Sequence, residues 1–410
     1  MREKKATICK KGIKAIMPLL SMLLLMNCSQ SGERAGDYPN DTLPLTKHWE
    51  SAVPHQTIPS GILSLKAKDC GSCHQEIYEE WKMSTHSVAL QDPQFQAEMK
   101  KDNIYACLNC HIPLQNQQEF IVTGLLDGDH KRPVRIPNPD FDAELQQESI
   151  TCAACHVRDG KVIGTIGMEG AIHAGVVDTE FLSEKLCISC HNVVDQLNPV
   201  LVCTFETGDE WKDNWAIREG KNCISCHMEE KERAIFPGGK IRKSHFHGFP
   251  GSGIPKFYDM KTTRLDGLEV TPDSLLATYQ QGDTIRYKLR LKNSFAGHNV
   301  PTGDPERFFL INFYLTDTRG DTVQTRQYRI GEVWEWHPVA KKVADDNLKP
   351  LEERDFIFAH APTREGKFTL KVAVTKHRIT KENADYNGLT EEYPMFTGVY
   401  ERAYEVEVVN

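Results

Sequence analysis

The sequence lacks any apolar run long enough to cross a bilayer as a helix. The apolar segment near the start, from Ala15 to Met26, has 12 residues, whereas a membrane-spanning helix needs about 20. Six basic residues precede it, at positions 2, 4, 5, 10, 11 and 14. A basic stretch followed by a short apolar run is typical of a bacterial secretion signal. We therefore expect residues 1–27 to direct export.

An excess of positive charge is also missing. The full chain has 49 Lys and Arg against 57 Asp and Glu, a formal net charge of −8. Without residues 1–27 these totals become 43 and 56, and the net charge becomes −13. Such a charge disfavours nucleic acid and acidic lipid surfaces as partners, and it favours proteins with basic docking faces.

Cysteines outside one repeated pattern are nearly absent. Of 13 cysteines, Cys9 lies in the expected signal, Cys28 follows that signal, and Cys203 stands alone in an apolar run. Cys203 has no free cysteine partner in the mature chain except Cys28, so we expect it to be a buried free thiol. The other ten form five copies of CxxCH: Cys70-Gly-Ser-Cys73-His74, Cys107-Leu-Asn-Cys110-His111, Cys152-Ala-Ala-Cys155-His156, Cys187-Ile-Ser-Cys190-His191 and Cys223-Ile-Ser-Cys226-His227.

The CxxCH pattern has a specific chemical meaning. Its two thiols attach to one haem c, and the histidine that follows binds the iron from the proximal side. A zinc site or a redox dithiol also uses CxxC, but neither requires the histidine. Five copies in an exported chain therefore predict five covalent haems, with proximal ligands His74, His111, His156, His191 and His227.

The apolar run ends at Leu25-Met26-Asn27-Cys28, and the chain turns polar at once. This pattern resembles a lipoprotein signal, in which the cysteine is lipidated, although Asn27 departs from the usual small residue. Ordinary signal cleavage nearby is the alternative. We expect residues 28–60, rich in Pro, Ser and Asp, to form a polar tether. The protein would then be a lipid-anchored lipoprotein on the periplasmic or cell-surface side of the outer membrane.

All five motifs lie within residues 61–254, which we expect to form a pentahaem domain. The stretch from Cys70 to Cys226 has 157 residues, about 31 for each haem. A chain this short has little room for an ordinary apolar core. The haems must therefore supply much of the core, wrapped by short helices and loops, and they must lie close enough to exchange electrons.

Residues 255–410 contain no haem motif and show a period of two. Between 285 and 291 apolar residues alternate with basic ones, as in a half-buried strand. Further strands are expected at 308–315, 368–374 and 404–409, with a turn at 318–321. The predicted fold class is therefore α+β and multidomain: a mainly helical and loop haem domain, followed by an antiparallel β-sandwich of immunoglobulin-like type.

Each haem iron also has a distal position. The segment from His74 to His86 lacks Gly and Pro and predicts a helix, which would place these histidines about 18 Å apart. His86 would then reach a neighbouring haem or face solvent. His298, in the loop GHNVPTG, is either a turn residue or a haem contact. The candidate distal ligands are His86, His130, His173, His245, His247 and His298.

The string CGSCHQEIYEEWKMSTHS, which begins at Cys70, resembles a signature of the cytochrome c-554 and hydroxylamine oxidoreductase group of multihaem cytochromes. In that group the last histidine is a distal ligand, so the resemblance assigns this role to His86, and it points also to His173 and to His245 or His247. GHNVPTGDPERFF resembles a motif of relatives with an appended β domain. Two features differ: the best-known members carry four or eight haems, and this chain has no CxxCK.

The sequence thus favours an electron carrier that passes electrons between redox proteins and is not itself an enzyme. If histidines fill every distal position, no iron is open to a substrate. The alternative is a haem oxidoreductase that acts on a small nitrogen or sulfur compound at one five-coordinate haem. The number of high-spin haems distinguishes the two.

Overall fold

The computed structural model describes residues 41–168 and 170–410, and residues Asp41–Asn410 form one compact unit. The expected signal, Cys28 and the first part of the expected tether lie outside the described residues. Within the described part of the chain, no helix is both long and apolar enough to span a membrane.

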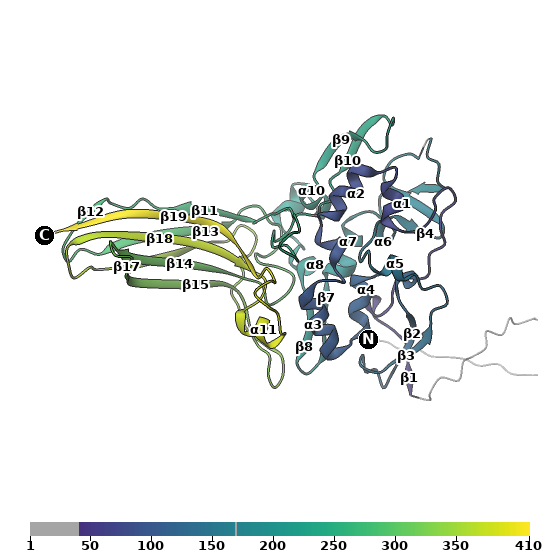
Figure 1. The fold of residues 1–410 in the computed structure, drawn as a ribbon, viewed down its shortest axis with the longest axis horizontal. Helices are drawn as coiled ribbons and strands as arrows, with labels where there is room; N and C mark the ends of the chain where they lie inside the picture. Colours follow the sequence, from purple (N-terminus) through teal and green to yellow (C-terminus); the bar gives the residue numbers. More distant parts are fainter. Residues whose placement is uncertain (1–40, 169) are drawn as a thin grey trace, which may run out of the picture. The chain divides into compact units, whose positions relative to one another are not determined.

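Short helices dominate the first half of the described chain (Figure 1), as predicted. Most have four or five residues, and α3 has ten. The α-helices are α1 (Ala67–Gly71), α2 (Gln75–Lys82), α3 (Pro93–Asp102), α4 (Leu108–His111), α5 (Ala143–Gln146), α6 (Cys152–His156), α7 (Glu184–His191), α8 (Thr207–Glu210), α9 (Trp215–Arg218) and α10 (Cys223–His227). Single 3-10 turns are η1 (His48–Glu50), η2 (Thr85–Val88), η3 (Tyr105–Cys107) and η4 (Gln115–Gln117).

The expectation of helices and loops alone in this half is wrong in one respect, because short strands also form four small sheets. Three strands begin within three residues of a CxxCH helix, so these hairpins reverse the chain directly after a motif. The strands are β1 (Thr42–Leu43), β2 (Phe120–Leu126), β3 (Pro133–Pro137), β4 (Val157–Arg158), β5 (Lys161–Gly164), β6 (Gly175–Val177), β7 (Val193–Asn198), β8 (Leu201–Phe205), β9 (Glu230–Ala234) and β10 (Ile241–His245).

Residues 255–410 form two sheets with one short helix, α11 (Lys381–Tyr386). One sheet has the order β11-β13-β17, and the other has the order β12-β19-β18-β14-β15-β16. The strands are β11 (Leu268–Pro272), β12 (Thr278–Gln280), β13 (Ile285–Asn293), β14 (Phe308–Asp317), β15 (Thr322–Glu335), β16 (Lys341–Asp345), β17 (Glu353–His360), β18 (Gly366–His377) and β19 (Phe396–Val409). Every strand predicted from the alternation is therefore present.

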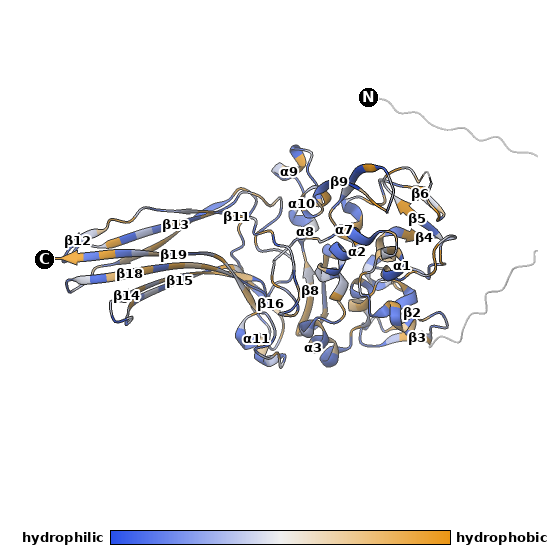
Figure 2. Ribbon diagram, turned by 45° about the horizontal axis from the view of Figure 1, so that its top comes forward, coloured by the Kyte–Doolittle hydropathy of each residue, from blue (hydrophilic) through white to orange (hydrophobic). Residues whose placement is uncertain are grey.

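The two sheets share one apolar core. Along β13, residues 285, 287, 289 and 291 are fully buried, and so are Ile311 and Phe313 of β14 in the other sheet. Figure 2 shows the resulting alternation of apolar and polar residues along the long strands. One pairing departs from the antiparallel prediction, because β12 runs parallel to β19. The immunoglobulin-like topology stays a prediction.

Residues 41–254, which we call the haem half, have no comparable core among those that the structure describes. Two small apolar clusters are present, one around Trp49 and Ile104 and one around Leu114 and Leu145. Such small clusters agree with the expectation that cofactors complete the interior of this half.

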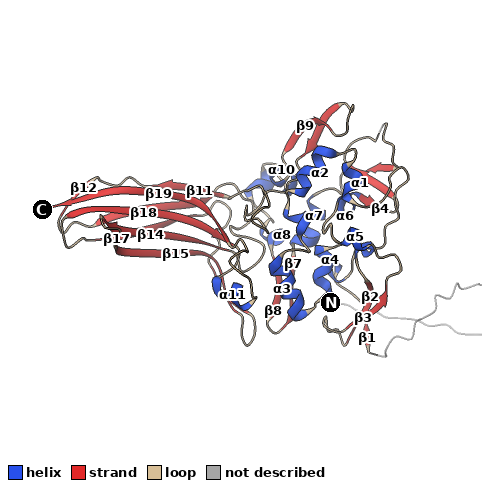
Figure 3. Cartoon of the chain, viewed as in Figure 1, coloured by secondary structure: helices blue, strands red, loops and turns tan. Residues whose placement is uncertain are grey.

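Contacts join the two halves, which Figure 3 distinguishes as mainly helical and mainly strand. The Tyr393 hydroxyl donates a hydrogen bond to Asp92 at the start of α3, over 2.9 Å, and Lys256 forms an ion pair with the same carboxylate. Gln94 donates to Glu306 over 3.0 Å. Residues 255–410, which we call the β region, therefore pack directly on helix α3 of the haem half.

Candidate haem sites

The CxxCH motifs lie on helical turns, which bring their three functional side chains together. Helices α4, α6, α7 and α10 each end on the motif histidine, whereas the first motif spans the end of α1 and leaves His74 as the N-cap of α2. On a helix, positions i, i+3 and i+4 share one face, so the two thiols and the imidazole point the same way. Within the described residues the cysteines form no disulfide.

The first motif also shows why glycine suits its second position. A Cβ at Gly71 would approach the Tyr78 ring to 2.6 Å, and the Tyr78 ring stacks in turn on Trp81 with centroids 5.7 Å apart. Trp81 donates from its indole nitrogen to the Ile150 carbonyl over 2.9 Å. The aromatic residues of α2 therefore hold the first motif against the third.

Backbone carbonyls orient the motif histidines through one ring nitrogen. Nδ1 lies 2.7 to 2.9 Å from a carbonyl oxygen in four of the five motif histidines. A hydrogen bond at Nδ1 fixes the tautomer and leaves Nε2 free to bind a metal. The carbonyls belong to Ile235 (for His74), Ala89 (for His111), Ile163 (for His156) and Pro250 (for His227).

Four motif histidines each face a second histidine from a distant part of the chain. Two imidazoles that bind opposite sides of one metal, each at about 2.0–2.1 Å, have ring centroids about 6 Å apart. The observed centroid distances are 6.1 to 6.5 Å, which fits this requirement. The pairs are His74 with His173, His156 with His247, His191 with His86, and His227 with His298.

The protein environment keeps several of these imidazoles neutral, the form that binds metals. Desolvation is the main cause in each case. It lowers the pKa of His86 to about 3, and that of His247 and His298 to about 4. The motif partner His191 also has its pKa lowered to about 4.

His111 of the second motif is different. The ring that contacts it is Phe95 of α3, stacked at 3.7 Å between centroids. In the described residues, no histidine faces His111 at the distance of the four pairs. Desolvation lowers the pKa of His111 to about 4, and the charged groups that act on it are Lys256 and Asp92.

The remaining two candidate histidines lie elsewhere. His130 stacks on Trp49, and its Nε2 lies 3.0 Å from the Glu50 carboxylate. The Nδ1 of His245 lies 2.8 Å from the Met228 carbonyl, and the backbone carbonyl of His245 accepts from His247 Nδ1. Of the two neighbours that the sequence could not separate, the structure therefore pairs His247 with a motif histidine.

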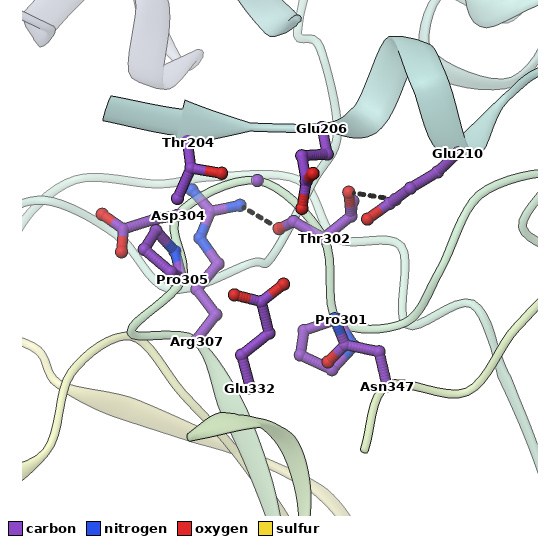
Figure 4. Close-up of a pocket in the computed structure, with 11 residues that line it drawn as sticks. Thr204, Glu206, Glu210, Pro301, Thr302, Asp304, Pro305, Arg307, Glu332 and Asn347 are labelled. Atoms are coloured by element: carbon purple, nitrogen blue, oxygen red, sulfur yellow. Dashed lines mark hydrogen bonds between the residues drawn. The ribbon is translucent and has the colours of Figure 1, made fainter. Parts of the chain in front are cut away.

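The sequence left His298 as either a turn residue or a haem contact, and in the structure its ring faces that of His227. A Cβ at Gly297 would overlap the Trp211 ring, so the loop packs tightly on α8. A small polar pocket adjoins the loop, where Glu210 accepts from the Thr302 hydroxyl over 2.6 Å (Figure 4). Desolvation raises the pKa of Glu210 to about 7. The signal in the sequence was the GHxxPTG string itself.

The motifs are also neighbours of one another. The thiols of Cys70 and Cys152 lie close enough to shift each other's pKa, and so do those of Cys110 and Cys190. Cys187 and Cys223 are close in the same way. The first motif thus adjoins the third, and the fourth adjoins both the second and the fifth, so each motif has at least one close neighbour.

Comparisons with known proteins give a family match to one segment and a match of fold over most of the chain. The family described as cytochrome c554 and c-prime matches residues 69–131. A penta-heme cytochrome c552 from Thermochromatium tepidum covers 85% of this chain and 100% of its own length, with 15% identity and a TM-score of 0.58. This match shows a common fold. No curated protein matches the sequence.

Two other solved structures match only a part of the chain. The CARDB domain of a Pyrococcus furiosus protein covers 35% of this chain and 87% of its own length, with 18% identity and a TM-score of 0.18. A β-glucosidase from Listeria innocua covers 35% of this chain and 16% of its own, with 15% identity and a TM-score of 0.19. Scores this low carry no argument about fold or activity.

Proposed function

We propose that this chain, a multihaem c-type cytochrome with a redox role, binds five haems and transfers electrons through a closely packed array. The observation that carries the proposal is the set of four histidine pairs with centroids 6.1 to 6.5 Å apart. Haem supplies the one-electron chemistry when bound. The chain supplies the thiols, the axial imidazoles and the spacing.

In this proposal His173, His247, His86 and His298 are distal ligands. They serve the haems whose proximal ligands are His74, His156, His191 and His227, in that order. A haem iron with two histidine ligands has no open position, so it suits electron transfer rather than substrate binding. His130 and His245 are not ligands in this assignment.

Each distal ligand comes from a segment outside the motif that it serves. His86 follows the first motif but faces the histidine of the fourth, and the Phe249 ring packs on it at 4.6 Å between centroids. A ligand shared in this way fixes one haem relative to the polypeptide of another. The closeness of the motif thiols supports the same conclusion, since electron transfer between haems requires short and fixed distances between them.

Electron paramagnetic resonance of the oxidised protein tests this proposal. We expect four low-spin signals of the bis-histidine type, and a mass equal to the polypeptide plus about five haems. Three or fewer attached haems in fully matured protein, or fewer than four low-spin haems, would contradict it.

The same proposal places the protein outside the cytoplasm, anchored through a lipid on Cys28 and served by redox partners with basic docking faces. The motifs require haem attachment after export, and the net charge of −13 without residues 1–27 favours basic partners. The lipid anchor is tested in the Discussion.

A second function is favoured by His111 alone. Because no histidine of the described residues faces His111 at the 6.1 to 6.5 Å of the four pairs, we propose that the haem at Cys107 and Cys110 is five-coordinate and binds a small nitrogen or sulfur compound. Carbon monoxide added to the reduced protein should bind to about one haem per chain. No binding of carbon monoxide would leave electron transfer as the sole proposed function.

A further inference from the structure

Three basic side chains meet where helix α3 packs on the β region, beside His111. We call Lys256, Arg307 and Arg378 the basic cluster. Arg307 and Arg378 both lower the pKa of Lys256, and Arg378 also lowers that of Arg307, so the three charges are close together. The side chain of Lys256 is 18% exposed and Arg378 is 6% exposed. Charges removed from water in this way are costly unless anions accompany them.

The hydrogen-bond and ion-pair partners of the basic cluster do not balance its positive charge. Lys256 forms an ion pair with Asp92. Arg307 donates to the Thr302 carbonyl over 3.0 Å, and in the described residues it forms no ion pair with a carboxylate. Arg378 donates through Nη2 to the carbonyls of Ile254 and Pro255, over 2.6 and 3.1 Å.

The second terminal nitrogen of Arg378, Nη1, is fully buried and has no hydrogen-bond partner. A buried donor without a partner costs about 1–3 kcal/mol, and more when it carries charge. The neighbouring carboxyls do not remove this cost. Desolvation, with nearby acidic groups, raises the pKa of Glu98 to about 7 and that of Glu306 to about 9. Asp92 and Asp304 are the carboxylates that raise the pKa of Arg307, so two aspartates stand against three basic side chains.

The basic cluster lies close to the second motif. Lys256 and Asp92 are the charged groups that act on His111. Asp92 caps α3 by accepting from the backbone of Gln94, and Phe95 of the same helix stacks on His111. The cluster therefore borders the one motif histidine that no second histidine faces.

We propose that the basic cluster binds a small carboxylate or oxyanion next to the haem of the second motif, with Arg378 Nη1 and Arg307 as its donors. Guanidinium groups suit such ligands because their parallel N–H donors match two oxygens of one anion. The anion has two possible sources, a propionate of the haem at Cys107 and Cys110 or a free oxyanion such as nitrite or sulfite. The inference rests on the proposed attachment of that haem.

The test uses the full-length holoprotein, wild type and Arg378→Gln, with Arg286→Gln as the matched control because Arg286 is an exposed arginine of the same β region. Mass spectrometry first confirms the number of attached haems in each, so loss of the haem is distinguished from loss of the anion. Sodium nitrite and sodium sulfite are then titrated into the oxidised proteins while the Soret band is followed. A redox titration of each protein gives the reduction potentials.

If a free oxyanion is the ligand, nitrite or sulfite shifts the wild-type Soret band saturably. Binding then weakens about tenfold or more in Arg378→Gln, as expected for the loss of one charged hydrogen bond, and stays unchanged in Arg286→Gln. If a propionate is the ligand, any shift of the band by either salt is the same in Arg378→Gln as in wild type. The reduction potential of one haem then falls in Arg378→Gln alone, since a lost positive charge favours the oxidised iron.

Equal anion binding and equal potentials in wild type, Arg378→Gln and Arg286→Gln would overturn the proposal. Should Arg378→Gln fail to retain its haems, Arg378→Lys and Arg307→Lys replace it. These variants keep the charge but lose the paired donors, so they too should weaken anion binding or lower one potential. Wild-type behaviour in both lysine variants would equally overturn the proposal.

Discussion

At the scale of single residues, the ligands come in two kinds that the chain specifies differently. A proximal histidine follows its cysteines directly, so its place is fixed by covalent geometry. A distal histidine such as His86 has no such link. It reaches His191 because α2 ends at Lys82 and the chain turns through Thr85–Val88, rather than continuing as the single helix that the sequence predicted. The backbone carbonyl of His86 accepts from Ile150 N over 3.1 Å, which holds this turn.

Replacing His86 with alanine should convert one low-spin haem to a high-spin haem while all five stay attached, because the thioethers and the proximal histidine remain. The measurement is electron paramagnetic resonance together with intact mass. His130→Ala is the control, since His130 binds Glu50 rather than facing a motif histidine. A loss of low-spin signal in His130→Ala, or none in His86→Ala, would show that the distal ligands are assigned wrongly.

At the scale of elements, the hairpin of β9 and β10 carries His247 toward the third motif. Arg233 of β9 fastens it to α2 by two hydrogen bonds to the Glu80 carboxylate, at 2.6 and 2.9 Å, with both side chains buried. The same Glu80 carboxylate accepts from the backbone nitrogen of His247 over 2.9 Å. The buried ion pair between Arg233 and Glu80 thus positions His247, a proposed ligand.

Arg233→Ala should therefore destabilise the protein, by up to about 3–5 kcal/mol, because it leaves the buried Glu80 carboxylate with Lys231 as its remaining ion-pair partner. Lys243→Ala on the same hairpin is the control. Its ion pair with Glu230 lies at the surface, where solvent screens such pairs and they contribute little to stability. Urea unfolding of the two holoprotein variants checks the difference, and similar losses in both would contradict the role given to Glu80.

The loop before β14 is the element that joins the β region to the haems. His298→Ala should turn one haem high-spin without reducing the number attached, because His298 faces His227 at 6.2 Å between centroids. A chain that ends at residue 254 should likewise acquire five haems and show the same high-spin signal. Unchanged spin states in both proteins would show that His298 is a turn residue and not a haem ligand.

At the scale of the whole molecule, close thiols place the first motif beside the third, and the fourth beside the second and the fifth. Cys190 of the fourth motif also acts on Cys155 of the third, which joins these two groups. In the proposed function, electrons that enter at any haem then reach the haem of the second motif, where the proposed open position lies. The β region adds the proposed ligand His298 and the basic cluster to the haem half, in addition to having its own core.

The proposed attachment of the whole molecule to a membrane depends on Cys28, which precedes the described residues. Cys28→Ser should move the protein from the membrane fraction to the soluble fraction after cell breakage, because no other segment of the sequence has the length of a membrane helix. Haem content should not change. Wild-type protein that is already soluble would show that ordinary signal cleavage occurs.

Several features followed from the sequence because they depend on neighbouring residues. The CxxCH motifs identify the haem thiols and proximal ligands within five consecutive positions, and the alternation from Ile285 to Leu291 predicted strand β13, because a strand buries every second side chain. The short hairpins after the motifs did not follow, since their strands are too brief to show a period.

Other features were decided by the tertiary structure alone. Which histidine faces which motif, and the absence of one opposite His111 in the described residues, depend on segments far apart in the chain, such as Thr85–Val88 and the loop at His298. The basic cluster likewise joins Lys256, Arg307 and Arg378 from three separate segments. Local composition cannot show such pairings, because they arise when packing brings distant segments to one place.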